Sequence, residues 1–541
     1  MTVANRRRRA LFVILLLGLL AALPLALGDS RTAGLALNTW LLAGAVVAAS
    51  VPLGTLLALL LVRTDLPGRK IFFALLAGLL FVPLYVQVGA WKAGFDLEGW
   101  YTLARSGPAL LDGWRGAIWV HAVAALPWVV LIVSAGLRLV ERELEEQALL
   151  DGTPWQVVRR VTLRRAVGSI GVAALWVAVA TSTEMAVTDY FQVRTYAEEV
   201  YIDIQLGGDL SSAPLGGAFG LLPGGTEADG DPVSLGVLPG VLICAWLVVA
   251  ACVLVAQLLP VVRQAIHGPP LEFELGVWRG PAACFVAAVV LLTVALPLGS
   301  LAYKCGIEVS QLGPERVRQW SPLKCATMVL SSPYRYRMEF GWSLLIGGLA
   351  ASAAVGAAVP LAWLARRGGW RAAPALSLAA LGLALPGPVI GLAIIALLNR
   401  PQIPPLRWLY DQSIAAPWLA QTWRGLPLAL LVLWAAVRSL PEEILESAAL
   451  EGARWPTILG RIVLPLRAWA IFGAWLAAFA AALAELDASV LAMPPGVETL
   501  TILIFNLLHY SVEDRVAGIC LALFLGIQIG TILLGRLAFR R

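Results

Sequence analysis

Four acidic residues stand inside or beside apolar stretches of the 541-residue chain. They form two groups about 300 positions apart, Glu184 with Asp189 and Glu485 with Asp487. An ionised carboxylate at the centre of a lipid bilayer costs about 2.5–3.5 kcal/mol, so such a residue usually faces a cavity or a partner. We expect the two groups to lie at equivalent depths beside a central polar pathway and to favour a cation there. The alternative is that each carboxylate caps a broken helix or pairs with an arginine.

A second set of residues occurs twice in one register, 300 positions apart: Glu146, Ala148, Gly152 and Trp155, then Glu446, Ala448, Gly452 and Trp455. The spacing predicts a short helix, a glycine that turns the chain at positive φ, and a second short helix with the tryptophan near its start. Such an element presents a compact knob to a soluble partner. The alternative is a solvated loop whose charges only enforce topology.

Composition identifies the elements that must position these residues. Apolar residues make up 59% of the chain and charged residues 14%, and the mean hydropathy is +0.81, so this is a polytopic membrane protein. About twelve apolar stretches are long enough to cross the hydrocarbon core as helices. They lie near 10–27, 34–62, 71–91, 116–140, 168–188, 234–262, 280–302, 341–365, 373–399, 416–437, 469–493 and 516–537. The sequence therefore predicts an all-α fold of two parallel six-helix repeats, 1–265 and 266–541.

The distribution of charge gives the expected orientation. When the spans alternate, most arginine-rich loops fall on the side of the N-terminus, which the positive-inside rule makes cytoplasmic together with the C-terminus. The segment 303–340 is the exception, because it carries six basic residues and is expected outside. The net charge of +6 lies in loops between lipid-length helices, which argues against nucleic-acid binding.

Cysteines and nucleotide motifs narrow the chemistry further. Cys305 and Cys325 fall in the external segment, where an oxidising compartment could join them as a disulfide. No cysteine or histidine spacing is typical of a metal site, and the chain has no Walker A or dinucleotide-binding motif. We expect no enzyme activity and no cofactor bound by this chain. Energy for uphill transport would have to come from a partner or an ion gradient.

The repeated element resembles a known family signature. The stretch from Glu446 to Gly452, followed by Ile462-Val463-Leu464-Pro465, is similar to the E-A-A-three-G-nine-I-x-L-P signature of binding-protein-dependent ABC importer permeases. Ser447 replaces one alanine. The copy at Glu146 to Gly152 is looser, with Gln147 at an alanine position and no final proline. Two copies in register are more specific than either alone.

The resemblance implies partners and a mechanism. In this family the repeated element is a coupling helix seated in an ATPase subunit, so two ATPase subunits would bind ATP and Mg²⁺, and an extracytoplasmic solute-binding protein would deliver the cargo to this inner-membrane chain. Pro83 and the cluster Leu385-Pro386-Gly387-Pro388 are expected to break corresponding spans of the two halves, as in helices that line a pathway.

The cargo is indicated by a further resemblance. Residues 485–494 are similar to the E-L-P-A-T-L-L-L-R-P stretch of ferric-iron permeases, although Asp487 stands at a proline position and Met493 at an arginine position. Fused two-repeat chains of this length are typical of ferric-iron and thiamine importers, so we expect ferric iron, with thiamine, a polyamine or another small solute as alternatives. A secondary transporter is a further alternative and would require inverted repeats.

Overall fold

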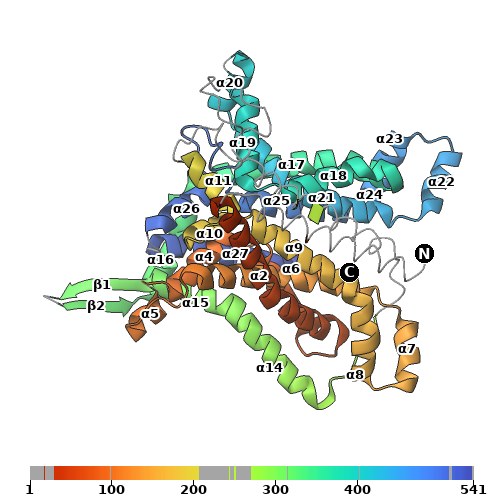
Figure 1. Ribbon diagram of the computed structural model, residues 1–541, viewed down its shortest axis with the longest axis horizontal. Helices are drawn as coiled ribbons and strands as arrows, with labels where there is room; N and C mark the ends of the chain where they lie inside the picture. The colour runs from red at the N-terminus through yellow and green to blue at the C-terminus, as the bar shows by residue number, and fades with distance from the viewer. Residues whose placement is uncertain are drawn as a thin grey trace.

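The computed structural model describes residues 30–97, 99–205, 270–312, 315–400, 402–510 and 514–538, together with Gly18 and four isolated positions between 243 and 250 (Figure 1). The first half is helical throughout this range. Its elements are α2 (Ser30–Arg63), α3 (Arg69–Leu79), α4 (Leu84–Phe95), α5 (Trp100–Arg105), α6 (Gly113–Arg138), α7 (Arg142–Asp151), α8 (Pro154–Val157), the π-helix η1 (Val158–Thr162), α9 (Leu163–Thr183), α10 (Ala186–Tyr190) and α11 (Tyr196–Gln205).

The second half repeats this order after an inserted hairpin. Its elements are η2 (Gly276–Trp278), α14 (Arg279–Val290), η3 (Leu291–Ala295), α15 (Leu296–Gly306), β1 (Ile307–Leu312), β2 (Glu315–Trp320), α16 (Pro322–Arg335), α17 (Arg337–Ala365), η4 (Gly369–Ala372), α18 (Ala373–Ala384), α19 (Gly387–Leu398), α20 (Pro404–Asp411), α21 (Ala415–Arg438), α22 (Glu442–Leu450), α23 (Trp455–Ile458), η5 (Leu459–Val463), α24 (Leu464–Leu466), α25 (Ala468–Ala484), α26 (Leu500–Tyr510) and α27 (Asp514–Ala538).

The long apolar helices confirm a multi-pass membrane fold. Within the described residues, seven helices are long and apolar enough to span a bilayer, or up to ten if each of three bent pairs forms one span. These ten correspond to ten of the twelve expected stretches. The other two, 10–27 and 234–262, fall almost wholly outside the described residues, as does the expected boundary at 265/266.

Two spans break at the prolines that the sequence singled out. Pro83 precedes α4, and the axis turns by 103° between 69–79 and 84–105. Pro386 precedes α19, and the axis turns by 111° between α18 and α19. A proline has no N–H for the helical ladder and its ring clashes with the preceding turn, which ends a helix there. A third bend, of 80° before α25, was not expected.

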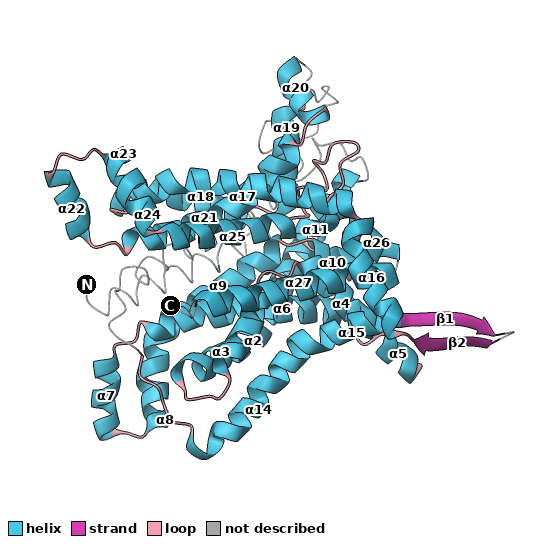
Figure 2. Ribbon diagram, turned by 180° about the vertical axis from the view of Figure 1, so that it is seen from behind, coloured by secondary structure: helices cyan, strands magenta, loops and turns pink. Residues whose placement is uncertain are grey.

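The repeated element has the same order of parts in both halves. A long helix (α6 or α21) leads into a short helix (α7 or α22), a turn, another short helix (α8 or α23) and a π-helix (η1 or η5). Figures 1 and 2 place both elements at one end of the molecule and the β1–β2 hairpin at the opposite end. The hairpin is antiparallel, with Ile307 opposite Trp320 and Leu312 opposite Glu315, and it is the part of the described chain that departs from the expected all-α fold.

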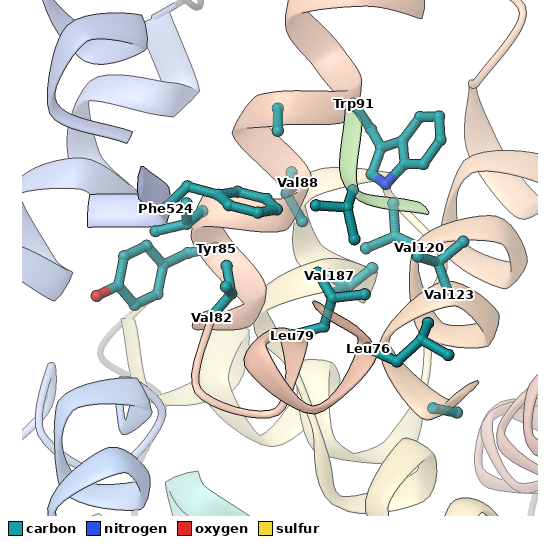
Figure 3. Packing of buried hydrophobic residues seen from close by; sticks show 14 of the residues in the cluster. Leu76, Leu79, Val82, Tyr85, Val88, Trp91, Val120, Val123, Val187 and Phe524 are labelled. Atoms are coloured by element: carbon teal, nitrogen blue, oxygen red, sulfur yellow. The ribbon is translucent and has the colours of Figure 1, made fainter. Parts of the chain in front are cut away.

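The two halves share part of their apolar core. The largest apolar cluster joins Leu76 of α3 and Val88 of α4 to Leu301 of α15 and Phe524 of α27. Figure 3 shows this packing at the α3–α4 break, with Val88 beside Phe524. A smaller cluster packs α2 and α11 against α18 and α19. Each half therefore buries part of its apolar surface against the other.

Candidate functional site

The two repeated elements, α7 with α8 and α22 with α23, are called the first and second knob, and they expose large apolar side chains at one end of the molecule. In the first copy Leu150 is 86% exposed and Trp155 67%, and in the second Leu450 is 90% exposed and Trp455 62%. Glutamates in the first turn of α7 and α22 favour these helices by facing the positive N-terminal end of each helix dipole. A leucine and a tryptophan left exposed in each copy are typical of a surface that a partner covers.

The repeated positions take the places that the spacing predicted, with one correction. Glu146 and Glu446 are exposed on α7 and α22, and Ala448 is buried against the core behind its helix. Gly452 has φ +81°, as expected for a turn that favours glycine. Gly152 does not, because its φ of −151° and ψ of 165° are extended backbone open to any residue. The first knob turns instead at a capping box between Thr153 and Gln156.

A buried ion pair anchors the first knob, and sequence reasoning missed it. Glu145 of α7 and Arg63 of α2 form a salt bridge with both side chains fully buried. Thr162 of η1 donates a hydrogen bond of 2.6 Å to the second carboxylate oxygen of Glu145. Arg63 also contacts the Leu137 carbonyl oxygen at 3.4 Å. The available signal was Arg63 at the end of an apolar span, which needs a buried partner if it does not reach water.

The second knob is anchored by apolar packing at the same positions. Leu445 and Ile462 stand where the first copy has Glu145 and Thr162, and both pack against the buried core of the second half. The two knobs thus share a shape but differ in what fixes them. Apolar groups of similar volume can replace a buried ion pair without loss of stability.

Glu184 and Glu485 have the same role in the two halves. Each follows the last residue of a long helix, α9 or α25, where the backbone becomes extended. Glu184 accepts hydrogen bonds from the Ala186 and Val187 amides at 2.8–3.2 Å. Glu485 accepts from the Ala488 and Ser489 amides, one position further along its own turn, at 2.8 and 3.0 Å. The structure bears out the capping alternative for both glutamates.

Asp487 and Glu184 also bring the halves together. Glu184 Oε2 lies 3.1 Å from Nε2 of the buried His121 on α6. The Asp487 carboxylate lies close to the Met185 amide, next to Glu184 in the chain, and within electrostatic reach of Glu184. Arg424 of α21 stands 3.8 Å from Asp487. The expected acidic groups therefore converge, each with a basic partner.

Asp189 completes a second contact between the halves. Its Oδ2 lies 3.0 Å from Nε2 of His509 on α26, and Nδ1 of that ring faces the Phe505 carbonyl oxygen at 2.9 Å. His121 is held alike, with Nδ1 at 2.9 Å from the Ala117 carbonyl oxygen. Each histidine therefore connects a carbonyl oxygen of its own helix to a carboxylate.

Both broken helices reach this region. The Tyr85 hydroxyl, just after the α3–α4 break, lies 3.2 Å from Thr501 Oγ1 and 3.4 Å from the Leu483 carbonyl oxygen near the end of α25. At the α18–α19 break a Cβ added to Gly387 would come within 2.1 Å of Asp487 Cβ, so the break packs directly on that residue. The turn that holds the carboxylates therefore lies between the two breaks.

The described residues contain no group of three or more histidine, cysteine, aspartate and glutamate side chains arranged to hold a metal ion. The expected disulfide is not formed either, since Cys305 and Cys325 are free thiols. They are neighbours, with Cys305 Sγ 3.7 Å from the Cys325 carbonyl oxygen, but this direction points the sulfur at the backbone of Cys325.

Comparison with known proteins adds a distant relationship. The chain is similar to permease subunits of transport systems. It is 28% identical over 129 residues to the trehalose transport system permease protein SugB of Mycobacterium tuberculosis, covering 24% of this chain and 43% of the relative. It is 29% identical over 180 residues to the molybdenum transport system permease protein ModB of Escherichia coli, covering 30% of this chain and 76% of the relative. No family model matches.

The matches cover only part of this chain and part of each relative. The chain spans less than half the length of the trehalose permease and about three quarters of the molybdenum permease. Each match covers less than a third of this chain. The named relatives transport chemically different solutes, so the shared feature is the permease subunit and not the cargo.

Proposed function

We propose that this chain is the membrane permease of an ABC importer, passing a solute from an extracytoplasmic binding protein to the cytoplasm. Separate ATPase subunits, one on each knob, would bind ATP and Mg²⁺ and supply the energy. The observation that carries the proposal is the pair of knobs at one end of the molecule, each exposing a leucine and a tryptophan. The similarity to permease subunits supports it.

The arrangement of the helices accounts for coupling. The first knob continues through the π-helix η1 into α9, and the second continues through the π-helix η5 and α24 toward α25. The helices α9 and α25 end at the capping residues Glu184 and Glu485, which lie between the two broken spans. A displacement of a knob by its ATPase is thereby applied to the turns that join the halves. Inverted repeats, as in a secondary transporter, would place the two knobs at opposite ends, so their common end favours the ABC importer.

The cargo proposed from the sequence is ferric iron, with thiamine or a polyamine as alternatives. The carboxylates by themselves do not indicate a cation, because His121, Arg424 and His509 contact three of them and the fourth, Glu485, caps a turn. The ferric-iron proposal therefore rests on the resemblance at residues 485–494. Uptake of labelled ferric iron, thiamine and putrescine into cells with and without the intact chain compares these cargoes.

The coupling surface is tested by copurification. The tagged chain, purified from membranes of its own host in mild detergent, is expected to bring down an ATPase subunit at two copies per chain. The double variant Leu150→Asp with Leu450→Asp should lose this subunit, because a charge at each contact would have to be desolvated. Leu97→Asp is the matched control, since Leu97 is 68% exposed and lies outside both knobs. Retention of the ATPase by the double variant would reject the proposal.

A further inference from the structure

The segment 303–340 carries six basic and three acidic residues, an excess that neither the knobs nor the carboxylate turn accounts for. The structure places it at the end of the molecule opposite α7 and α22, as the β1–β2 hairpin and α16 (Figures 1 and 2). We propose that α16 lies in the membrane–water interface and that the apolar groove beside it holds an acyl chain of an anionic phospholipid.

The side chains of α16 separate into three faces. Met328 and Ser332 face the protein, where Met328 packs so closely on α27 that a Cβ at Gly518 would stand 3.2 Å from it. Leu323, Leu330 and Tyr334 recur at helical spacing on another side and are 74–79% exposed. Thr327, Ser331 and Arg335 form the polar side, and Lys324 pairs with Asp514 at the start of α27 at 2.8 Å. An apolar stripe next to a polar and basic stripe is the pattern of a helix lying in the plane of a membrane interface.

The groove is formed where α16 meets α15 and α27. It has a volume of about 580 Å³ and is lined almost wholly by apolar side chains, among them Leu298, Ala302, Trp320, Ala326, Val329 and Leu525. Leu525 is eleven residues from the start of α27, about 16 Å along the helix at 1.5 Å per residue. The groove thus runs from the end of that apolar span to the depth at which lipid chains lie.

The mouth of the groove suits a lipid head group. Trp320 lines the groove, and its indole N–H donates to the Ala302 carbonyl oxygen at 3.2 Å; tryptophan is a residue type enriched at membrane interfaces. Arg318 is exposed two residues before Trp320 on β2, and Arg335 is exposed at the opposite end of α16. Their charge complements an anionic phosphate head group and not a second copy of the same basic segment.

Quenching of Trp320 fluorescence tests occupancy directly. The purified chain in mixed micelles is titrated with dibrominated phosphatidylglycerol or dibrominated phosphatidylcholine, and the signal of the Trp320→Phe variant is subtracted to remove the other 20 of the 21 tryptophans. We expect saturable Trp320 quenching, reached at lower concentration with phosphatidylglycerol. Native mass spectrometry of the unaltered chain provides the independent measurement, with one retained phosphatidylglycerol expected.

Variants separate the groove from the surrounding micelle. Ala326→Phe fills the groove and should weaken the lipid affinity measured by quenching about tenfold, the effect of losing contact with about two methylene groups. Thr327→Phe adds the same ring to the polar side of α16 and should leave it unchanged. The double variant Arg318→Gln with Arg335→Gln should abolish the preference for phosphatidylglycerol. Equal quenching in both phenylalanine variants, no preference in the unaltered chain, or a dimer by light scattering would overturn the proposal.

Discussion

The buried anchor of the first knob gives a prediction whose magnitude follows from the structure. Arg63 and Glu145 are fully buried, and Thr162 holds the second carboxylate oxygen. Glu145→Leu removes one charge and leaves Arg63 buried without its counterion, which costs about 3–5 kcal/mol. The second half shows the alternative, since Leu445 and Ile462 hold its knob without any charge. The triple variant Arg63→Leu, Glu145→Leu, Thr162→Ile should therefore recover most of the stability that the single variant loses.

Hydrogen exchange of the α7 amides measures the effect where it occurs. In Glu145→Leu we expect α7 amides to exchange about 100-fold faster or more, which corresponds to the lower end of that cost, whereas α22 amides should be unchanged. Unfolding of the purified protein in mixed micelles gives the global free energy. Glu146→Leu is the matched control, because Glu146 is exposed on the same helix and its pair with Arg142 lies in solvent, where ion pairs contribute little. If the triple variant were as unstable as the sum of its single variants, the account of the anchor would be wrong.

Three further predictions concern stability. Burial raises the pKa of Glu198 on α11 from 4.5 to about 7, so the folded state binds this proton more tightly than the unfolded state and loses stability as pH rises from about 4.5 to 7. Glu198→Gln should therefore raise the melting temperature at pH 8 but not at pH 4.5. The exposed Glu451→Gln is the control and should show no such difference. Glu485→Ala should lower the free energy of unfolding by about 1–2 kcal/mol. Glu485→Gln should lower it by less, because glutamine keeps one oxygen that can accept from the capped amides. Equal losses in the two variants would contradict the capping role. Gly452→Ala should cost about 1–2 kcal/mol at its positive φ, whereas Gly152→Ala should cost less in the same unfolding titration.

The sequence was most informative where neighbours in the chain decide the structure. The broken spans at Pro83 and Pro386 were predicted because a proline interrupts its own helix. The knobs were predicted because helix length, turn and tryptophan all lie within about ten residues. The prediction of a positive φ at Gly152 was wrong. Its copy of the turn is fixed by the capping box of Thr153 and Gln156, so the glycine does not need positive φ.

The partners of the carboxylates could not be predicted from the sequence. The position of these acidic residues inside apolar stretches predicted that they line a pathway. The charge of such a lining also depends on which side chains contact each carboxylate. His121 lies 63 positions from Glu184, and His509 lies 320 positions from Asp189. No local pattern in the sequence pairs residues at such separations. Only the structure supplies these partners.

The sequence by itself determined a polytopic helical membrane protein, its two broken spans and its paired knobs, because apolar length, proline and turn chemistry act on the residues beside them. Only the tertiary structure decided that Glu145 and not Glu146 anchors the first knob, that the two halves share part of their cores, and that an amphipathic α16 borders an open apolar groove. Those features depend on which distant surfaces pack together, and burial, which fixes the cost of an unpaired charge, exists only after packing.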